Sequence, residues 1–308
     1  MSTPKNKDLS LIAMGVINIT PDSFSDGGMW LDRDKLSQHL LDCWQAKVLL
    51  DVGAESTAPG APKLSGDVEW DRWEKYFFPA YEGLLKKHQA MSDHSVSIDS
   101  YHSSTVSKVI KRLVEIGMNG TIIWNDISGK FDDHVCECLS NYPQLKYIYC
   151  YNRAPSRNES QDHLKYVHAS EMTEREYFLH MVNYFHSAII QASKIKAVDR
   201  LILDPTFGFS KTREQNFRLW KMLPKIAHEI GHPDWLIGVS RKSFLRPSGQ
   251  KITEPGAQEK SEWSESFLLG DLIANFLELS VIKNLMIRNH RLDLLNSLID
   301  FHLEKMKA

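Results

Sequence analysis

The sequence is poor in cysteine and contains no long apolar run. Four cysteines cannot form a disulfide framework in a chain of 308 residues. Cys136 and Cys138 have no second pair after them and no matching histidine cluster, which argues against a zinc site. The apolar runs fall well short of the ~20 residues that a membrane span needs, and the start, MSTPKNKDLS, lacks the apolar core of a signal peptide. We therefore expect a cytoplasmic protein with no membrane segment.

Strong charge of one sign is also missing. The formal net charge is −2, so the chain as a whole should attract neither nucleic acid nor an anionic membrane. Any anion site must therefore be local. The remaining composition, 42% hydrophobic and 25% charged, is typical of a globular protein that buries a full core.

Apolar segments of strand length alternate with amphipathic segments of helix length. We predict strands at residues 9–18, 48–53, 96–100, 121–126, 146–151, 200–205, 235–240 and 285–290. Helical patterns between them include residues 32–46, 103–116, 175–195 and 212–230. Such alternation indicates parallel strands joined by crossover helices.

The pattern predicts an α/β protein with a (β/α)8 TIM barrel, and a doubly wound sheet is the alternative. No repeat or long linker divides the chain, so we expect one domain over residues 9–308 after a flexible N-terminal tail at residues 1–8. Two polar segments, 152–173 and 246–264, each follow a strand and should form lids or surface loops on the catalytic face.

Polar residues stand at the carboxyl ends of most predicted strands. They are Asn18, Asp51, Asp99, Asn125, Asp126, Asp204, Ser240, Arg241, Lys242, Arg288 and His290. Any one of the acids could simply cap a helix. Capping does not explain why seven of the eight strands end this way. In a barrel these ends meet at one mouth, where catalytic residues lie.

One of these strand ends carries a long motif. Residues 14–28 read MGVINITPDSFSDGG, an apolar strand that runs into a polar loop. This motif closely resembles the first signature of dihydropteroate synthases, the folate-biosynthesis transferases that join a dihydropterin pyrophosphate to p-aminobenzoate and release pyrophosphate. Four later segments resemble the same family in the same order, so the resemblance covers most of the chain.

The resemblance implies a pterin site deep in the barrel. Carboxylates and amides suit an aminopyrimidinone edge, because an unpaired polar group there would be costly. The implied pterin ligands are Asp99, Asn125, Asp204, Phe209 and Lys242. Asp99, Asp204 and Lys242 would also be the catalytic residues, acting through positioning and electrostatics without a protein nucleophile.

The resemblance also implies sites for the other groups of the reaction. Cations and donors at the mouth suit a pyrophosphate; the residues implied are Asn18, Thr57, Arg241, Arg288 and His290. Asn18 would contact Mg²⁺ bound to the diphosphate. The aryl amine would lie against Pro21, Phe24, Thr57, Ser240 and Lys242. A homodimer is compatible with the resemblance, and no nucleic-acid partner is expected.

The chain departs from the family pattern at several positions. Ala58 replaces an arginine that would contact pyrophosphate, and we expect Lys63 as its candidate substitute. The fifth strand has Tyr149-Cys150 in place of Met-His, and Tyr149 could take over the methionine's face against the pterin. The other departures are Arg153, which could add charge at the mouth, Thr206 in place of glycine, and Asn289 between Arg288 and His290.

These departures keep two alternatives open. One is a weakly active or inactive paralogue that binds a pterin. The other is a folate-binding methyltransferase on the same barrel, but such an enzyme has no reason to keep the anion-binding residues of SRKS and RNH. Those residues therefore favour a diphosphate substrate.

Overall fold

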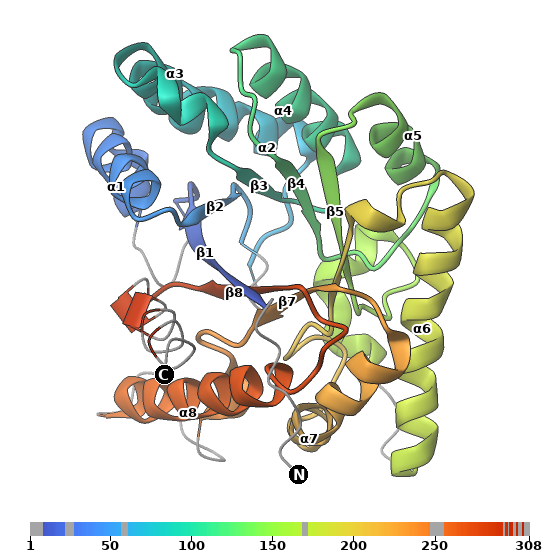
Figure 1. Ribbon diagram of the computed structural model, residues 1–308. Coiled ribbons are helices and arrows are strands. Elements are labelled where there is room, and N and C mark those ends of the chain that lie inside the picture. Colours follow the sequence, from blue (N-terminus) through green and yellow to red (C-terminus); the bar gives the residue numbers. More distant parts are fainter. Residues whose placement is uncertain are drawn as a thin grey trace.

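The computed structural model describes residues 9–21, 28–56, 61–167, 172–246 and 256–291, with 293–294, 296–297, 300 and 304. Within these residues eight parallel strands pair in chain order, and the barrel closes where β1 (Ser10–Asn18) pairs with β8 (Asn284–Asn289). Helices surround the strands on the outside (Figure 1). The predicted (β/α)8 TIM barrel is confirmed, and the doubly wound alternative is wrong.

The remaining strands and helices follow one another along the chain. The strands are β2 (Leu49–Gly53), β3 (Val96–Asp99), β4 (Ile122–Asp126), β5 (Leu145–Cys150), β6 (Leu201–Asp204) and β7 (Asp234–Gly238). The α-helices are α1 (Arg33–Gln45), α2 (Gly66–Arg72), α3 (Phe78–Lys87), α4 (Ser103–Glu115), α5 (Asp133–Asn141), α6 (Glu174–Lys194), α7 (Arg213–Ile230) and α8 (Ala257–Phe276). Every predicted strand matches an observed strand to within two residues at either end.

Helical structure occurs in both polar segments. The 3₁₀ segment η4 (Arg157–Tyr166) lies inside the first of them. The second was predicted to be a lid or loop throughout, and that prediction is wrong for its last part, because α8 begins at Ala257. Capping shapes other elements: Thr173 and Thr212 form capping boxes at the starts of α6 and α7.

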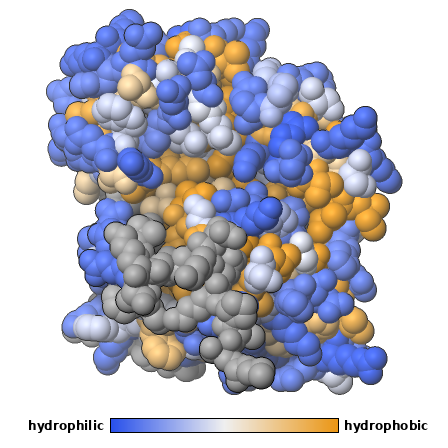
Figure 2. Space-filling model, viewed as in Figure 1, coloured by the Kyte–Doolittle hydropathy of each residue, from blue (hydrophilic) through white to orange (hydrophobic). Residues whose placement is uncertain are grey.

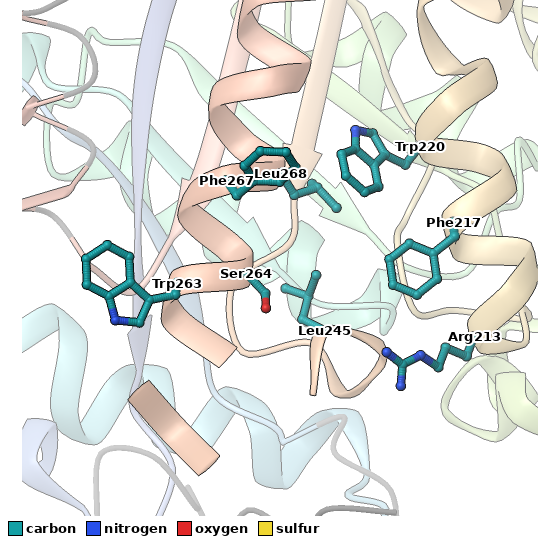
Figure 3. A pocket seen from close by; sticks show the side chains of 8 residues that line it. All are labelled: Arg213, Phe217, Trp220, Leu245, Trp263, Ser264, Phe267 and Leu268. Carbon is teal, nitrogen blue, oxygen red and sulfur yellow. The ribbon is translucent and has the colours of Figure 1, made fainter. Parts of the chain in front are cut away.

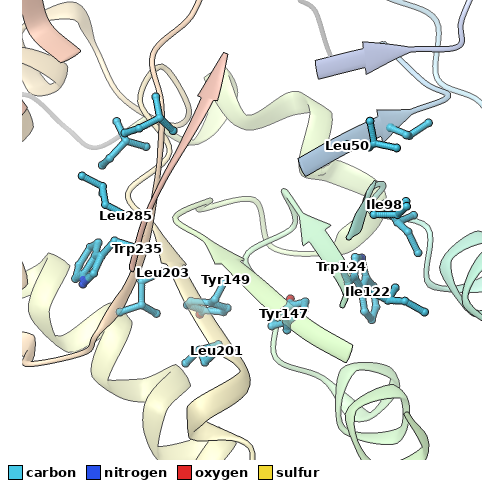
Figure 4. Packing of buried hydrophobic residues seen from close by; sticks show 14 of the residues in the cluster. Leu50, Ile98, Ile122, Trp124, Tyr147, Tyr149, Leu201, Leu203, Trp235 and Leu285 are labelled. Atoms are coloured by element: carbon cyan, nitrogen blue, oxygen red, sulfur yellow. The ribbon is translucent and has the colours of Figure 1, made fainter. Parts of the chain in front are cut away.

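Two apolar layers hold the barrel. The outer layer lies between strands and helices, where Trp124, Tyr147, Tyr149, Leu203 and Trp235 pack (Figure 4). The inner layer fills the barrel itself, and its buried members are Met14, Leu49, Ile123, Ile148, Cys150, Ile202, Leu236 and Met286. Successive residues of a strand alternate between the two layers, as the pleat requires.

This alternation places polar side chains directly above the inner layer. Two residues after Leu49, Ile123, Ile202 and Met286 come Asp51, Asn125, Asp204 and Arg288. A two-residue step returns a side chain to the same face of a strand. The same pattern that builds the apolar floor therefore points these polar groups into the barrel near the strands' carboxyl ends.

On the face that Figure 2 shows, hydrophilic residues cover much of the helices, and hydrophobic residues show mainly between them. A groove of partly apolar lining runs between α7 and α8, where Phe217 and Trp220 face Phe267 and Leu268 (Figure 3). Trp263 and Phe267 are 72% and 68% exposed there. This groove shares no residue with the strand-end cluster. Among the helices that the structure describes, none has the length and apolarity to cross a bilayer.

Candidate active site

Asp204 is a buried carboxylate at the end of β6. It is 6% exposed, and its Oδ1 accepts a hydrogen bond of 2.7 Å from the Thr206 backbone N–H. Burial raises the pKa of Asp204, while Thr206 and the charges of Lys242 and Lys211 oppose the rise. The native protein thus disfavours the ionised form of this carboxyl group. Ionisable groups with shifted pKa values of this kind are typical of binding and catalytic sites.

Asn125 and Cys150 lie beside Asp204 in the same polar layer. The Cys150 thiol is 3.6 Å from Asp204 Oδ2 and 4.0 Å from Asn125 Oδ1. Burial holds the pKa of Cys150 well above its usual value, so the group is a neutral thiol. Asn125 is 3% exposed. The structure therefore brings together two of the predicted pterin ligands, with a weak donor between them.

Lys242 and Phe209 complete this side of the cluster. Lys242 Nζ lies 4.7 Å from the centroid of the Phe209 ring, a cation–π distance. Phe209 also stacks on His163, with ring centroids 3.9 Å apart. Burial and the charge of Arg288 lower the pKa of Lys242 to about 8, although Asp204 pulls it upward. The charges of Asp204 and Arg288 thus both act on Lys242, and its contact with a pterin stays a prediction.

Arg288 and Asp99 form an ion pair across the barrel. Arg288 Nη2 is 2.6 Å from Asp99 Oδ2, and Arg288 Nε is 2.5 Å from Asp51 Oδ2. Burial raises the pKa of Asp99 to about 7, with the Arg288 charge opposing it and Asp51 adding to it. The two bonds use only some of the guanidinium N–H groups, and others remain for a diphosphate oxygen.

A second polar group joins the ends of β7 and β8. Ser240 Oγ donates to Asn289 Oδ1 at 3.0 Å and lies 3.2 Å from His290 Nδ1. Glu265 of α8 accepts from Asn289 Nδ2 at 2.7 Å and from the Arg241 backbone N–H at 3.1 Å. Asn289, which replaces a small apolar residue of the family pattern, is therefore a buried connector between these two strand ends.

The first two loops are described only in part. Asn18 ends β1 opposite Gly53 of β2, and Pro21 is exposed beyond it. Arg72 of α2 donates to Thr20 Oγ1 at 2.8 Å and to the Ala54 carbonyl at 2.7 Å, so it ties the bases of both loops together. Phe24, Thr57 and Ala58 lie outside the described residues, and their predicted roles stay predictions.

The η4 segment contributes contacts that sequence reasoning missed. Gln161 Nε2 donates to Glu55 Oε1 at 2.6 Å, and Lys63 Nζ pairs with Asp162 Oδ2 at 2.7 Å. Arg157 pairs with Asp126 Oδ2 at 2.5 Å. The segment thus fastens the second loop to the end of β4. The residues that η4 contacts lie far from it in the sequence, and no periodic sequence pattern predicts these contacts.

One prediction about the family departures is wrong. Tyr149 does not face the pterin position, because it points outward and stacks on Tyr184 of α6 at 5.1 Å. Cys150 occupies the inward place instead. Lys63 pairs with Asp162 at 2.7 Å, and its role as substitute cation stays a prediction. Burial, with the charge of exposed Arg153, lowers the pKa of His180 of α6, and the charge that Arg153 could add at the mouth stays a prediction.

The turn after β6 is held by a lysine that sequence reasoning also missed. Thr206, Gly208 and Ser210 have φ values of 52°, 91° and 49°, in the left-handed region. Lys211, 4% exposed, donates to the Thr206 and Phe209 carbonyls, both at 2.9 Å. A threonine at positive φ costs free energy; its hydroxyl accepts from the Tyr151 N–H at 2.9 Å, which offsets part of that cost. This framework fixes Asp204 and Phe209.

The donor set fits a cation that arrives with a substrate, rather than a resident metal. Among the described residues no three His, Cys, Asp or Glu side chains converge to hold an ion. Asn18 supplies one hard oxygen at the barrel mouth. Mg²⁺ commonly binds through one or two protein oxygens, water and substrate phosphates. The residues present therefore fit Mg²⁺ carried by a diphosphate.

Comparison with known proteins agrees with this geometry. The sequence profile described as pterin binding enzyme matches residues 14–270. The dihydropteroate synthase of Clostridium beijerinckii is 32% identical over 235 residues, covering 75% of each chain. The mitochondrial folate synthesis bifunctional protein of Pisum sativum is 28% identical over 261 residues, or 81% of this chain and 46% of that protein. The chain thus spans about half the length of that relative.

Solved structures agree on the fold. The Yersinia pestis dihydropteroate synthase in complex with a sulfonamide drug has a TM-score of 0.71 at 24% identity, covering 96% of this chain and 94% of that one. The Clostridium difficile enzyme, solved in the presence of pteroic acid, has a TM-score of 0.69 at 23% identity, covering 97% and 98%. The profile match spans most of the chain. The chain therefore belongs to the pterin binding enzyme family.

Proposed function

We propose that the protein is a dihydropteroate synthase: a transferase that joins the pterinylmethyl group of a dihydropterin pyrophosphate to p-aminobenzoate in folate biosynthesis. One observation carries the proposal. Asp204 and Asn125 are buried polar groups inside the barrel, and the half-buried Lys242 lies within electrostatic reach of Asp204 and Arg288. Asp204, Asn125 and Lys242 suit the polar edge of a flat heterocycle such as a pterin. Arg288 suits a diphosphate group attached to that heterocycle.

Each residue of the site would have a separate role in the reaction. The Asp204 carboxylate and the Asn125 amide would bind the pyrimidine edge of the pterin and exclude water from it. Protonated Lys242 would donate to the ring and balance the charge of Asp204. Ser240, Arg241 and His290 would contact the diphosphate or the amine from the ends of β7 and β8, where the structure groups them.

Bond making and breaking then need no protein nucleophile. The C–O bond between the exocyclic methylene and the diphosphate breaks, and its electron pair leaves with pyrophosphate. The amine nitrogen forms the new C–N bond and loses one proton. Arg288, fixed by Asp51 and Asp99, would stabilise the charge that develops on the leaving group. When bound, Mg²⁺ would neutralise part of the diphosphate charge, with Asn18 as its protein ligand.

Steady-state turnover tests the proposal. Purified protein is mixed with 6-hydroxymethyl-7,8-dihydropterin pyrophosphate, p-aminobenzoate and Mg²⁺, and dihydropteroate is measured by mass spectrometry. The proposal requires dihydropteroate to form. Pterin binding without product would instead support the paralogue, which the Ala58 departure favours. Methyl transfer from a methylated folate would support the methyltransferase.

Two further expectations stay predictions. The cytoplasmic location predicted from the sequence is one of them. A homodimer is the other, and sedimentation equilibrium of the purified chain measures it directly.

A further inference from the structure

Asp51 is a completely buried carboxylate whose part in the proposed reaction is so far only to hold Arg288. It lies in the middle of β2, and it is 0% exposed. Its Oδ1 accepts from Ser97 Oγ of β3 at 2.7 Å and from Asn125 Nδ2 of β4 at 3.1 Å. Its Oδ2 accepts from Arg288 Nε of β8 at 2.5 Å. One carboxylate thus joins side chains from three other strands.

The bond to Asn125 decides which way that amide faces. A carboxylate offers only acceptors, so only the NH₂ group of Asn125 can turn toward Asp51. The Asn125 oxygen is then left on the other side, where Cys150 Sγ lies 4.0 Å away. Without Asp51 either end of the amide could face a ligand. With it, Asn125 presents an acceptor oxygen next to Asp204 and Cys150.

The bond to Arg288 decides the plane of the guanidinium. An arginine side chain has several rotatable bonds, and a single ion pair would leave the group free to swing. Here Asp51 holds the Nε edge, and Asp99 holds Nη2 at 2.6 Å. Two carboxylates on neighbouring strands therefore fix the group in one orientation.

We propose that Asp51 is a positioning residue that sets both the amide facing the pterin and the guanidinium facing the diphosphate. This inference rests on the proposed function and goes beyond it. Asp51 itself touches neither substrate and acts through Asn125 and Arg288. The pterin side and the diphosphate side of the site therefore both depend on the buried Asp51 carboxylate.

Asp51→Asn is the direct test, because it keeps the shape of the side chain. An asparagine has one acceptor oxygen and one NH₂ group, so whichever way it faces, either Asn125 or Arg288 meets a donor where it had an acceptor. We measure binding of 6-hydroxymethylpterin, and separately of inorganic pyrophosphate with Mg²⁺, by calorimetry. A bond to a charged group is lost, so at least one affinity should fall by about tenfold to a hundredfold.

Two reference variants separate positioning from direct contact. Asn125→Ala should weaken the pterin only, and Arg288→Met should weaken pyrophosphate. Because Asp51 acts through Asn125, Asp51→Asn should add less than about threefold to the loss of pterin affinity in the Asn125→Ala background. Ser97→Ala removes the third bond to Asp51 without touching Asn125 or Arg288, so it should change either affinity by less than about threefold.

Asp51→Asn could leave Arg288 with too little compensating charge for the protein to fold. In that case the comparison is made in the Arg288→Met background, where Asp51 keeps its bond to Asn125. Adding Asp51→Leu there removes every acceptor that residue 51 offers to Asn125, so pterin binding should weaken by about tenfold or more.

Each result has one meaning. If the wild type binds neither ligand, the proposed function is wrong and the inference falls with it. If the wild type binds both and folded Asp51→Asn binds both equally well, only the inference is overturned. Fully additive losses with Asn125→Ala would also overturn it, because Asp51 would then act independently of Asn125.

Discussion

Asp204→Asn tests whether Asp204 binds the pterin or instead stabilises the fold. Asp204 is 6% exposed, and its Oδ1 accepts from the Thr206 N–H at 2.7 Å. An asparagine keeps that bond with its own oxygen, so its NH₂ group must take the place of Oδ2, near Cys150. The substitution therefore changes the charge and one hydrogen-bonding atom while leaving the shape alone.

The expected loss of pterin affinity follows from these contacts. A hydrogen bond to a charged group contributes about 1.5–3 kcal/mol. A pyrimidine edge that donates twice to Asp204 would lose about 3 kcal/mol or more, which is about a hundredfold in dissociation constant or more. Calorimetry with 6-hydroxymethylpterin measures it. Unchanged affinity would refute the assignment of Asp204 to the pterin.

Stability should move in the opposite direction. Because burial raises the pKa of Asp204, the native state disfavours its charged form, and that contribution reduces stability as pH rises through the native pKa. A neutral asparagine removes this cost, so the thermal midpoint near pH 7.5 should stay the same or rise. A lower midpoint together with lost binding would mean that Asp204 is structural.

Asp126→Asn is the matched control. Asp126 is also a buried carboxylate at a strand end, but it pairs with Arg157 at 2.5 Å and accepts from the Ser128 N–H at 2.8 Å. Its loss weakens a buried ion pair, which costs about 1–3 kcal/mol. We expect a lower thermal midpoint with pterin affinity changed by less than about threefold, the reverse of Asp204→Asn.

Three further predictions concern the protonation of Lys242, the role of Mg²⁺ and the residue at position 58 in the second loop. Burial and Arg288 lower the pKa of Lys242 to about 8, so pterin affinity should be highest below that pH and fall about tenfold by about pH 9 as the lysine loses its proton. Lys242→Arg should remove this pH dependence. An unchanged pH profile in that variant would mean that another group titrates. Chelation of Mg²⁺ should weaken pyrophosphate binding while phosphate-free pterin still binds, and equal losses of both would contradict a cation carried by the diphosphate. Ala58→Arg should raise turnover roughly tenfold to a hundredfold if the missing cation limits the reaction, and no gain would mean that the site compensates in another way.

The sequence predicted the barrel well because its signals are local. Short apolar runs bounded by turn residues mark buried parallel strands, and every predicted strand was confirmed. The strand-end polar residues could also be predicted, since a parallel barrel brings all carboxyl ends to one side. Alternation along β5 would have shown that Cys150 points inward and Tyr149 outward, so that error was avoidable.

The contacts that the sequence could not predict join distant residues. Lys63 and Asp162 pair across 99 positions, and Arg288 and Asp51 across 237. Such pairs depend on the stagger between strands and on the path of loops that have no period. Asp51 was visible as a strand-end acid, but its bonds to Asn125 and Arg288 follow only from the closed barrel.

The most direct test of the proposed function is the stoichiometry of one turnover. Enzyme in excess is mixed with dihydropterin pyrophosphate and Mg²⁺, with and without p-aminobenzoate, and pyrophosphate and dihydropteroate are measured over time. A dihydropteroate synthase releases one pyrophosphate for each dihydropteroate formed, and does so only when the amine is present. Pyrophosphate release that is the same with and without the amine, or no release from bound substrate, would contradict the proposal that this site joins a pterin to an aryl amine.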